Sequence, residues 1–562
     1  GISVPYECHP IICIHVITHF HCFFCGCCAA SSPCTSQSLD LRFRSGIVMP
    51  ASDSQLLDAG QPAASLENGV PSELQQQGEE EEEVSAGGGG ATDLLFLMEA
   101  AWAIGPSFIG DLVVLSLLGC IMGALSYGYM YLVGNVTEQW LSAVSDYEYP
   151  SDFESIKLMN GSALWIPICW GGGTIVGILK VIVGIDEYPS FLEDLRHREV
   201  CPISASKVLV CCIASLLAGA AMGPEAGLGA AGGAVGTLLS RVLCGGELCN
   251  GQAEMGEARR KERLHMYTLA GMSAAFGSIL PAPWVALLLV LELSFQPFDE
   301  AGRQKVMLGN QSICLLGLSA SLAWVVKYAL DKSSGDAETP PLPGAMLDFE
   351  YSNELAGKAI LLGFASVIVL LVYFIVAGVT KRIFLRLTRL LQRRCGKRIR
   401  IILMASLAGL LTGCLGYLVP LSLTDGATQI MPTLKACKTQ HFSTSDLIAI
   451  AFAKSAAYWV AAGGGLVGGI FFPLLYIGII AGELLAKFEL FAPGARLTVP
   501  VMMASVPSSI MPAFFTMIAL PLSTFNLGPK WCVPIFIASL TSYTVLVGTG
   551  LLRRLLLKAA SA

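Results

Sequence analysis

The stretch Met222-Gly223-Pro224-Glu225-Ala226-Gly227-Leu228-Gly229 places one carboxylate among glycines, in a sequence apolar enough to be buried in a membrane. A charge in hydrocarbon costs at least about 2.5–3.5 kcal/mol, so we expect Glu225 to face a cavity that holds water or ions. Pro224 suits the first turn of a helix, and the small residues around it allow close backbone approach. We predict a helix that begins within the membrane, whose unpaired N–H groups attract an anion, or the Glu225 carboxylate when no anion is bound.

The composition is typical of a polytopic membrane protein. Of the 562 residues, 54% are hydrophobic and only 14% are charged, and the mean hydropathy is +0.64, which argues against a soluble protein. The net charge of −7 includes the acidic run from Glu79 to Glu83 outside the apolar part, so it indicates no nucleic-acid partner. The cysteines outside the N-terminal region are scattered through apolar segments without paired metal-ligand spacing, so no disulfide framework is expected.

Residues 1–92 are expected to lie outside the membrane domain. The stretch 1–48 contains no methionine and mixes cysteines with histidines, a composition that could bind metal. We interpret it instead as a leader or targeting segment, with synthesis starting at Met49, and we predict no metal site. The stretch 51–92 is rich in Ser, Gln, Glu and Gly and contains the acidic low-complexity run, so we expect it to be disordered.

Apolar segments that are long enough to cross or enter a bilayer recur along the rest of the chain. They cover 112–133, 164–184, 203–221, 223–243, 265–293, 306–326, 359–380, 401–423, 447–486, 499–525 and 532–552. The segment 447–486 must hold two helices around its glycines. Several segments are interrupted by Gly or Pro, and broken helices are tolerated at membrane depth only where their freed backbone lines a protein cavity.

Charge placement orients these segments, because loops rich in Lys and Arg remain on the cytoplasmic side. Dense basic stretches lie at 259–263, 381–400 and 553–554. Two glycosylation sequons, Asn135-Val136-Thr137 and Asn160-Gly161-Ser162, fall with acidic residues in the loop predicted after the first segment. We therefore expect that loop to be extracytoplasmic.

An internal repeat divides the membrane domain into two halves. The fragment Gly277-Ser278-Ile279-Leu280-Pro281-Ala282 nearly recurs as Ser508-Ser509-Ile510-Met511-Pro512-Ala513, and the run through Gly223-Pro224-Glu225 has a counterpart in Gly468-Gly469-Ile470-Phe471-Phe472-Pro473. Two halves with glycine-broken segments in corresponding places indicate a transport fold with its substrate site between the halves. We assign 93–330 to the first half, 331–356 to an extracytoplasmic loop and 357–562 to the second half, without a C-terminal regulatory domain.

These residues resemble a known family. Gly223-Pro224-Glu225-Ala226-Gly227 is similar to the gating-glutamate motif of the CLC chloride channels and chloride/proton antiporters, and Gly469-Ile470-Phe471-Phe472-Pro473 matches their G-x-F-x-P motif. The resemblance covers roughly 94–557. It implies an all-α polytopic membrane protein, built as an inverted repeat of two halves with broken helices, which forms a homodimer with one pore in each subunit.

The resemblance also implies residue roles. Glu225 would be the gate, whose carboxylate occupies the outer anion site and swings away on protonation or chloride entry. The anion would be bound at Gly223, Pro224, Gly469, Ile470 and Phe471, with the backbone amides of Ile470 and Phe471 as its donors. Such amides bind chloride without a full positive charge that would trap it. Chloride is then the substrate, no cofactor is needed and no catalytic residue is assigned.

Three departures from the family pattern qualify these roles. The serine-bearing G-S-G-I-P motif is absent near Gly184-Ile185-Asp186-Glu187-Tyr188-Pro189, so the inner anion site stays unassigned. The antiporters relay protons through an internal glutamate, whereas here Glu292 is followed by Leu293 at the relay position, which favours a channel. Tyr543 precedes the helix that carries the pore tyrosine of the family, and we interpret it as a packing or interfacial aromatic. Glu292 and Tyr543 remain candidate pore-lining residues.

The prediction is a chloride channel, gated by voltage or pH, in the plasma membrane or an organelle membrane. The alternatives are a chloride/proton antiporter of the same fold and a secondary transporter of another small anion, such as nitrate or fluoride. A membrane enzyme would need a catalytic constellation, and the sequence contains none that we recognise.

Overall fold

The computed structural model describes residues 106–151, 158, 161–185, 198–244, 253–294, 309–334, 353–439, 442–491 and 494–554. The expected leader and acidic run in 1–92 lie outside these residues, as does most of the loop assigned to 331–356. The chain divides into two units, Gly1–Ser107 and Phe108–Ala562. The architecture below is that of the second unit.

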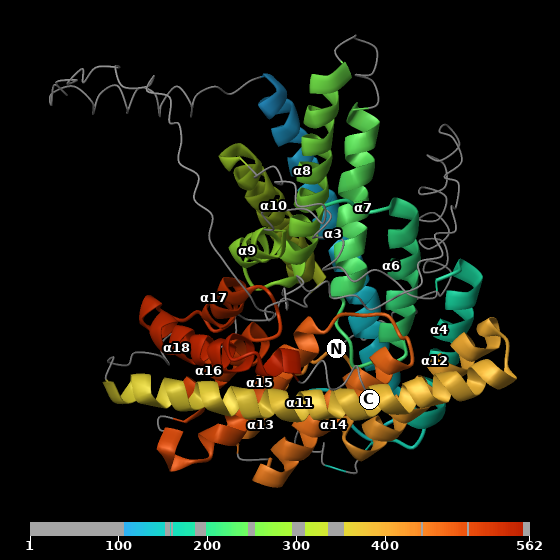
Figure 1. The fold of residues 1–562 in the computed structure, drawn as a ribbon, viewed down its shortest axis with the longest axis vertical. Coiled ribbons are helices and arrows are strands. Elements are labelled where there is room, and N and C mark those ends of the chain that lie inside the picture. Colours follow the sequence, from blue (N-terminus) through green and yellow to red (C-terminus); the bar gives the residue numbers. More distant parts are fainter. Residues whose placement is uncertain are drawn as a thin grey trace, which may run out of the picture. The chain divides into compact units, whose positions relative to one another are not determined.

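The described chain is helical throughout (Figure 1). The first half contains α3 (Pro106–Ala143), α4 (Trp165–Val183), α6 (Pro202–Leu217), α7 (Glu225–Cys244), α8 (Ala253–Ile279), α9 (Pro283–Ser294) and α10 (Asn310–Ser334). The second half contains α11 (Asn353–Arg394), α12 (Lys397–Leu418), α13 (Ile430–Lys438), α14 (Thr444–Gly463), α15 (Phe471–Ala486), α16 (Ala495–Ser508), α17 (Phe514–Thr524) and α18 (Cys532–Tyr543). In the described part, eight helical segments are long and apolar enough to cross a membrane, and α6, α9, α15 and α17 are shorter apolar helices. The chain is thus an integral, multi-pass membrane protein.

The helices of the two halves pack against one another in the same order. In the first half α6 packs on α7, α7 on α8, and α8 on both α9 and α10. In the second half α14 packs on α15, α15 on α16, and α16 on both α17 and α18. The two copies of the fragment repeated in the sequence mark the break between α8 and α9 and the break between α16 and α17. The internal repeat is therefore confirmed in space, and α4 of the first half lies along α12 of the second (Figure 1).

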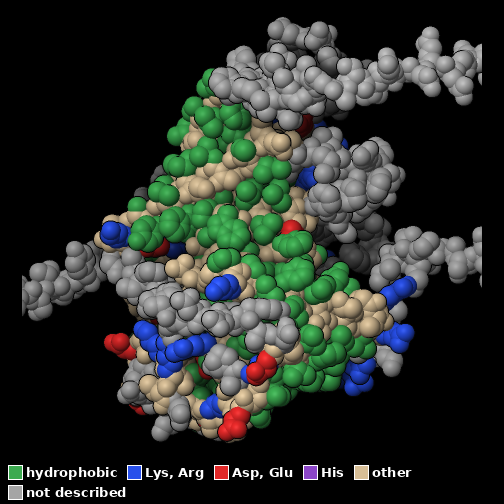
Figure 2. Space-filling model, turned by 90° about the vertical axis from the view of Figure 1, so that its left-hand side faces the viewer, with side chains coloured by type: hydrophobic (Ala, Val, Ile, Leu, Met, Phe, Trp, Pro, Cys, Tyr) green, Lys and Arg blue, Asp and Glu red, His purple; other side chains and the backbone are tan. Residues whose placement is uncertain are grey.

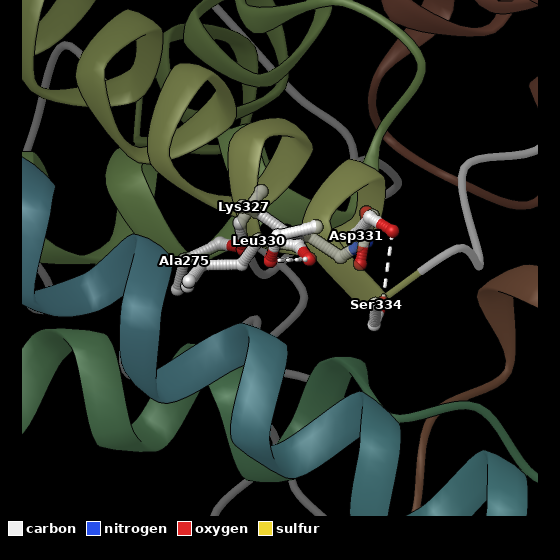
Figure 3. Close-up of polar contacts among 7 residues, drawn as sticks. Ala275, Lys327, Leu330, Asp331 and Ser334 are labelled. Carbon is white, nitrogen blue, oxygen red and sulfur yellow. Dashed lines mark hydrogen bonds and ion pairs between the residues drawn. The ribbon is translucent and has the colours of Figure 1, made fainter.

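Small residues permit the closest helix contacts. A Cβ on Gly119 or Gly123 of α3 would lie 2.5–2.6 Å from a carbonyl oxygen of α10, so only glycine allows this approach. Figure 3 shows α10 beside α3, with Lys327 and Asp331 one turn apart on α10. Their Nζ and Oδ2 atoms lie 2.5 Å apart, so two charges are paired at the end of an otherwise apolar helix.

Two predicted segments, 265–293 and 499–525, each divide into two helices. The breaks fall at Pro281 and Pro512, because proline lacks an N–H group and disfavours helical backbone in the residue before it. The short helix α13 was not predicted. The basic stretch 381–400 is mostly helical, since α11 continues to Arg394 and α12 begins at Lys397.

The expectation that both sequons lie in a loop is wrong for the first of them. Helix α3 continues to Ala143, so Asn135-Val136-Thr137 is helical. The Thr137 side chain is buried, which does not suit a glycosylation acceptor. Asn160 lies outside the described residues.

One face of the helical part is largely apolar. Figure 2 shows hydrophobic side chains over a broad, continuous area of one face, with most Lys and Arg side chains toward its margins. On α11 the side chains of Ile368 and Ile375 are 63% and 64% exposed. Exposed apolar area of this extent is typical of a lipid-facing surface.

Candidate functional site

The loops that precede α7 and α15 meet between the two halves. The Gly223 N–H donates to the Gly469 carbonyl at 2.9 Å, and the Gly469 N–H donates to the Gly223 carbonyl at 2.8 Å. Helix α7 begins at Glu225 and α15 begins at Phe471, so this pair of hydrogen bonds fixes two helix N-termini beside each other. Both ends carry unpaired N–H groups and partial positive charge.

Glycine at both positions of this pair leaves room for the Glu225 side chain. A Cβ on Gly223 or on Gly469 would collide with the carboxylate of Glu225. The absence of side chains here therefore makes the space in which that carboxylate lies. Pro224 begins the first turn of α7, where its carbonyl accepts the Leu228 N–H at 3.0 Å.

The Glu225 side chain reaches from the start of α7 to the start of α15. It is 2% exposed, and its Oε1 accepts the Phe472 N–H at 2.8 Å. Its Oε2 is buried and has no hydrogen-bond partner among the described residues. A first-half carboxylate thus occupies the N-terminus of a second-half helix with only one of its two oxygens hydrogen-bonded.

The start of α15 lacks a cap of its own. Ile470 is its N-cap residue and offers no side-chain acceptor, so Glu225 supplies the oxygen that a capping residue would normally supply. Sequence reasoning named the amides of Ile470 and Phe471 but not that of Phe472. Because an acceptor at the N-cap position bonds the second or third N–H of a helix, a predicted start at Phe471 could have identified Phe472. The Phe471 side chain is 2% exposed, with its ring centroid 5.5 Å from that of Phe472.

Helices α3 and α6 pack against the first turn of α7. The Tyr129 hydroxyl lies 3.4 Å from the Cys212 sulfur, and both groups are buried. A Cβ on Gly227 would lie 3.0 Å from that sulfur and 3.1 Å from that hydroxyl. Gly227 therefore lets a tyrosine and a cysteine, neither of them predicted as site residues, lie next to the turn that carries Glu225.

Side chains from other helices hold the two loops. The buried Lys180 of α4 donates from Nζ to the Gly465 carbonyl at 2.7 Å, and the Val467 N–H donates to the Ser215 hydroxyl at 2.9 Å. At the end of α6, where the other loop begins, the Trp140 indole N–H of α3 donates to the Leu217 carbonyl at 3.1 Å. These hydrogen bonds hold the loop before α15 against α4 and α6, and the end of α6 against α3.

Glu292 and Tyr543 lie together at another place, the N-terminus of α17. Glu292 accepts the N–H groups of Phe515 and Thr516, each at 2.8 Å, and the Thr516 hydroxyl at 2.6 Å. The Tyr543 ring packs edge-on against Phe514, with centroids 5.9 Å apart, and is 41% exposed. Glu292 is therefore a helix-capping residue, and the packing role expected for Tyr543 agrees with this contact.

The stretches in which the inner anion site and a metal site were considered lie largely outside the described residues. Gly184 and Ile185 are described, whereas 186–197 are not, so the stretch in which the serine motif was sought lies largely outside the description. The described residues contain no group of three or more His, Cys, Asp and Glu side chains that could hold a metal ion. The histidines and cysteines of 1–48 are outside them.

Comparison with known proteins gives both a family model and solved structures. The model described as "Voltage gated chloride channel" matches residues 171–546. The fold is similar to that of a slow cyanobacterial Cl−/H+ antiporter, with a TM-score of 0.58 and 18% identity over 80% of this chain and 98% of the other. It is also similar to a CLC-type fluoride/proton antiporter, with a TM-score of 0.51 and 17% identity over 78% of this chain and 95% of the other. A third similar structure is a eukaryotic CLC transporter, with a TM-score of 0.53 and 14% identity over 83% of this chain and 75% of the other.

Curated relatives match a shorter part of the chain. YfeO from Escherichia coli (strain SMS-3-5 / SECEC) and from Escherichia fergusonii, a protein whose name suggests ion transport, is 35% identical over 95 residues. This match covers 17% of the present chain and 22% of YfeO.

Proposed function

Since the chain belongs to the voltage gated chloride channel family, we propose that it conducts chloride across a membrane and that Glu225 is the gate. One observation carries the proposal: the Glu225 carboxylate, from one half of the chain, lies on the N-terminus of α15, from the other half. A carboxylate and a halide are both anions, and a helix N-terminus binds either. The protein's own side chain therefore competes with the transported ion for the same N–H groups.

The gating step follows from this competition. Protonation of Glu225 removes its negative charge, and the neutral group binds the helix N-terminus less well than chloride does. Chloride that enters at high concentration displaces the carboxylate in the same way. Since the donors are backbone N–H groups instead of a lysine or arginine, the ion is held weakly enough to leave again. In this scheme Gly223 and Gly469 provide the space, and the amides of Ile470, Phe471 and Phe472 provide the donors.

We favour a channel over a proton-coupled antiporter. A proton relay needs an acid that can take up and release a proton along the path of transport. Glu292, the acid nearest to the relay position in the sequence, instead accepts three hydrogen bonds at the start of α17. Leu293 beside it is buried and cannot titrate. These contacts support transport of chloride without a stoichiometric proton.

The test is a flux assay on the full chain reconstituted in liposomes. We expect valinomycin-dependent chloride efflux, with no uphill proton movement when a chloride gradient is applied. Absence of efflux from well-folded protein would refute chloride transport, and proton uptake driven by chloride would refute the channel and support the antiporter. The same assay with fluoride and nitrate tests the anion: efflux of either ion that is faster than that of chloride would favour the alternative substrate.

We also propose a homodimer. Helices α9, α17 and α18 lie beside one another and expose large apolar side chains, among them Trp284 (50% exposed), Phe515 (57%) and Phe536 (39%). An apolar face that joins both halves suits the isologous contact of a two-fold dimer. The molar mass of the purified protein in detergent, measured by light scattering, is expected to be twice that of the chain. A monomer would contradict this part of the proposal.

A further inference from the structure

The C-terminal third of α11 is a basic extension of a membrane-spanning helix. Helix α11 is one continuous helix of 42 residues (Figure 1), whereas about 20 residues are enough to cross the hydrocarbon core of a bilayer. Its apolar part ends at Thr380, and the stretch 381–400 that follows contains nine Lys and Arg residues and no Asp or Glu. Because basic segments beside a membrane span remain on the cytoplasmic side, this extension lies at the cytoplasmic surface of the membrane.

Four arginines of the extension lie on one face of α11. They are spaced by four, three and four residues, which places side chains above one another on a helix, and they form what we call the arginine stripe: Arg382, Arg386, Arg389 and Arg393. All four side chains are exposed, and none of them forms an ion pair with a carboxylate of the described residues. Like charges at this spacing repel one another, so the stripe favours an anion beside it.

Apolar side chains border the arginine stripe on both sides. At 3.6 residues per turn, Ile383 and Leu390 lie along one edge of the stripe and Leu385 lies along the other. These three side chains are 55%, 50% and 43% exposed. A soluble anion bound to the arginines would leave this apolar border in water, whereas the acyl chains of a lipid would cover it.

The opposite face of the extension packs on the protein. Phe384 is 4% exposed, and a Cβ on Gly463, at the end of α14, would lie 3.0 Å from its ring. The Thr388 hydroxyl lies 3.8 Å from the Met404 sulfur of α12. Because α12 and α14 hold this face, the arginine stripe faces away from the rest of the protein.

We propose that the arginine stripe binds the headgroups of anionic phospholipids in the cytoplasmic leaflet. A guanidinium group pairs with phosphate oxygens through two parallel N–H donors, and the negative surface potential of this leaflet attracts basic segments that lie next to a membrane span. The apolar border selects a lipid over a soluble phosphate, because it offers a surface that only acyl chains cover. The lipid contact is independent of Glu225 and of the transported ion.

Native mass spectrometry of the full chain in detergent, titrated with phosphatidylserine or with phosphatidylcholine of the same acyl chains, tests the proposal. We expect phosphatidylserine to bind at least about tenfold more tightly. The pair Arg386→Gln/Arg389→Gln should weaken phosphatidylserine binding by about 10–30-fold and leave phosphatidylcholine binding unchanged. The matched control is Lys381→Gln/Arg394→Gln, which removes the same charge from the same helix outside the stripe and should weaken binding less than about threefold.

Equal affinity for the two lipids would overturn the proposal. Equal losses in the two pairs of variants would do so as well, since they would show attraction by the net charge of the helix without a site. Arg386→Lys/Arg389→Lys keeps both charges and should bind phosphatidylserine more tightly than the Gln pair does. If the Gln pair does not fold, Arg389→Gln alone decides, with an expected loss of about 3–10-fold.

A separate measurement distinguishes a lipid from a soluble phosphate. Glycerophosphoserine, which has the phosphatidylserine headgroup without acyl chains, should fail to displace the lipid when it is added in excess. Ile383→Gln/Leu390→Gln keeps the arginines and should weaken phosphatidylserine binding by about threefold or more, because contact with the acyl chains is lost. Displacement by glycerophosphoserine at the concentration of the lipid would identify a soluble phosphate as the partner and would overturn the assignment to lipid.

Discussion

At the scale of single residues, the Glu225 carboxylate lies where the proposed gate needs an anion, on the N-terminus of α15. One oxygen accepts the Phe472 N–H, and the other is buried without a partner among the described residues. In the proposed gating scheme, a halide competes with this carboxylate for the N–H groups at the start of α15.

Replacement of Glu225 by Gln should remove the pH dependence of flux. The amide has no charge at any pH, so it does not compete with chloride for the N–H groups of α15. We expect flux at neutral pH to rise to about the acid-stimulated level of the wild type and to change less than about twofold between pH 4.5 and 7.5. Glu483→Gln, the same change at a buried position later in α15, is the control. Wild-type pH dependence in Glu225→Gln would exclude the gate role.

Gly469→Ala tests whether the carboxylate lies where the structure places it. The new methyl group would collide with Glu225, so the free energy of unfolding should fall by about 1–3 kcal/mol, the usual cost of overpacking. The background variant Glu225→Ala should cancel most of this loss, because the colliding atoms are gone. Gly128→Ala, at a helical glycine with open space around it, should be neutral. Equal losses of stability in both backgrounds, measured by denaturant unfolding, would place the carboxylate elsewhere.

At the scale of elements, sequence reasoning predicts apolar helices well and their ends poorly. The contact between the N-termini of α7 and α15 could be anticipated from the sequence. Each helix is preceded by a glycine-rich run, and glycine lets another backbone approach closely. Pro281 and Pro512 were recognised as parts of the repeated fragments, but 265–293 and 499–525 were each kept as one segment because both are apolar along their length. The loop 419–429 could not be identified at all, since its carbonyls accept hydrogen bonds from Lys454 of α14, which is distant in sequence.

The contacts of Glu292 also depend on a helix that is distant in sequence. The sequence shows an isolated acid in an apolar helix, whereas the structure shows a cap on a helix more than 200 residues away. Glu292→Ala should lower the free energy of unfolding by about 1–2 kcal/mol, the usual cost of a lost N-cap. Glu292→Gln should lower it less, because its amide oxygen still accepts one N–H. Both variants are expected to keep the pH dependence of flux, and its loss in Glu292→Gln would argue for a relay role.

At the scale of the whole molecule, the halves form a single site through a few fixed contacts. Helix α4 lies along α12, where Gly173 and Gly409 let the two backbones touch, and the Gly223–Gly469 pair joins the halves at the site itself. Each chain therefore contains every group that the proposed gate uses. A dimer would then hold two complete sites, and neither would need a residue from the partner.

A covalently linked dimer with one wild-type subunit and one Glu225→Gln subunit tests this independence. If each chain has its own pore, the flux of the linked dimer is the sum of two separate terms. The wild-type subunit contributes a pH-dependent part, the variant subunit contributes a pH-independent part, and each should be about half of that in the corresponding uniform dimer. A linked dimer of two wild-type subunits is the control for the linker. A mixed dimer whose whole flux followed one subunit would show a shared pore or coupled gates, because the fluxes through two independent pores add.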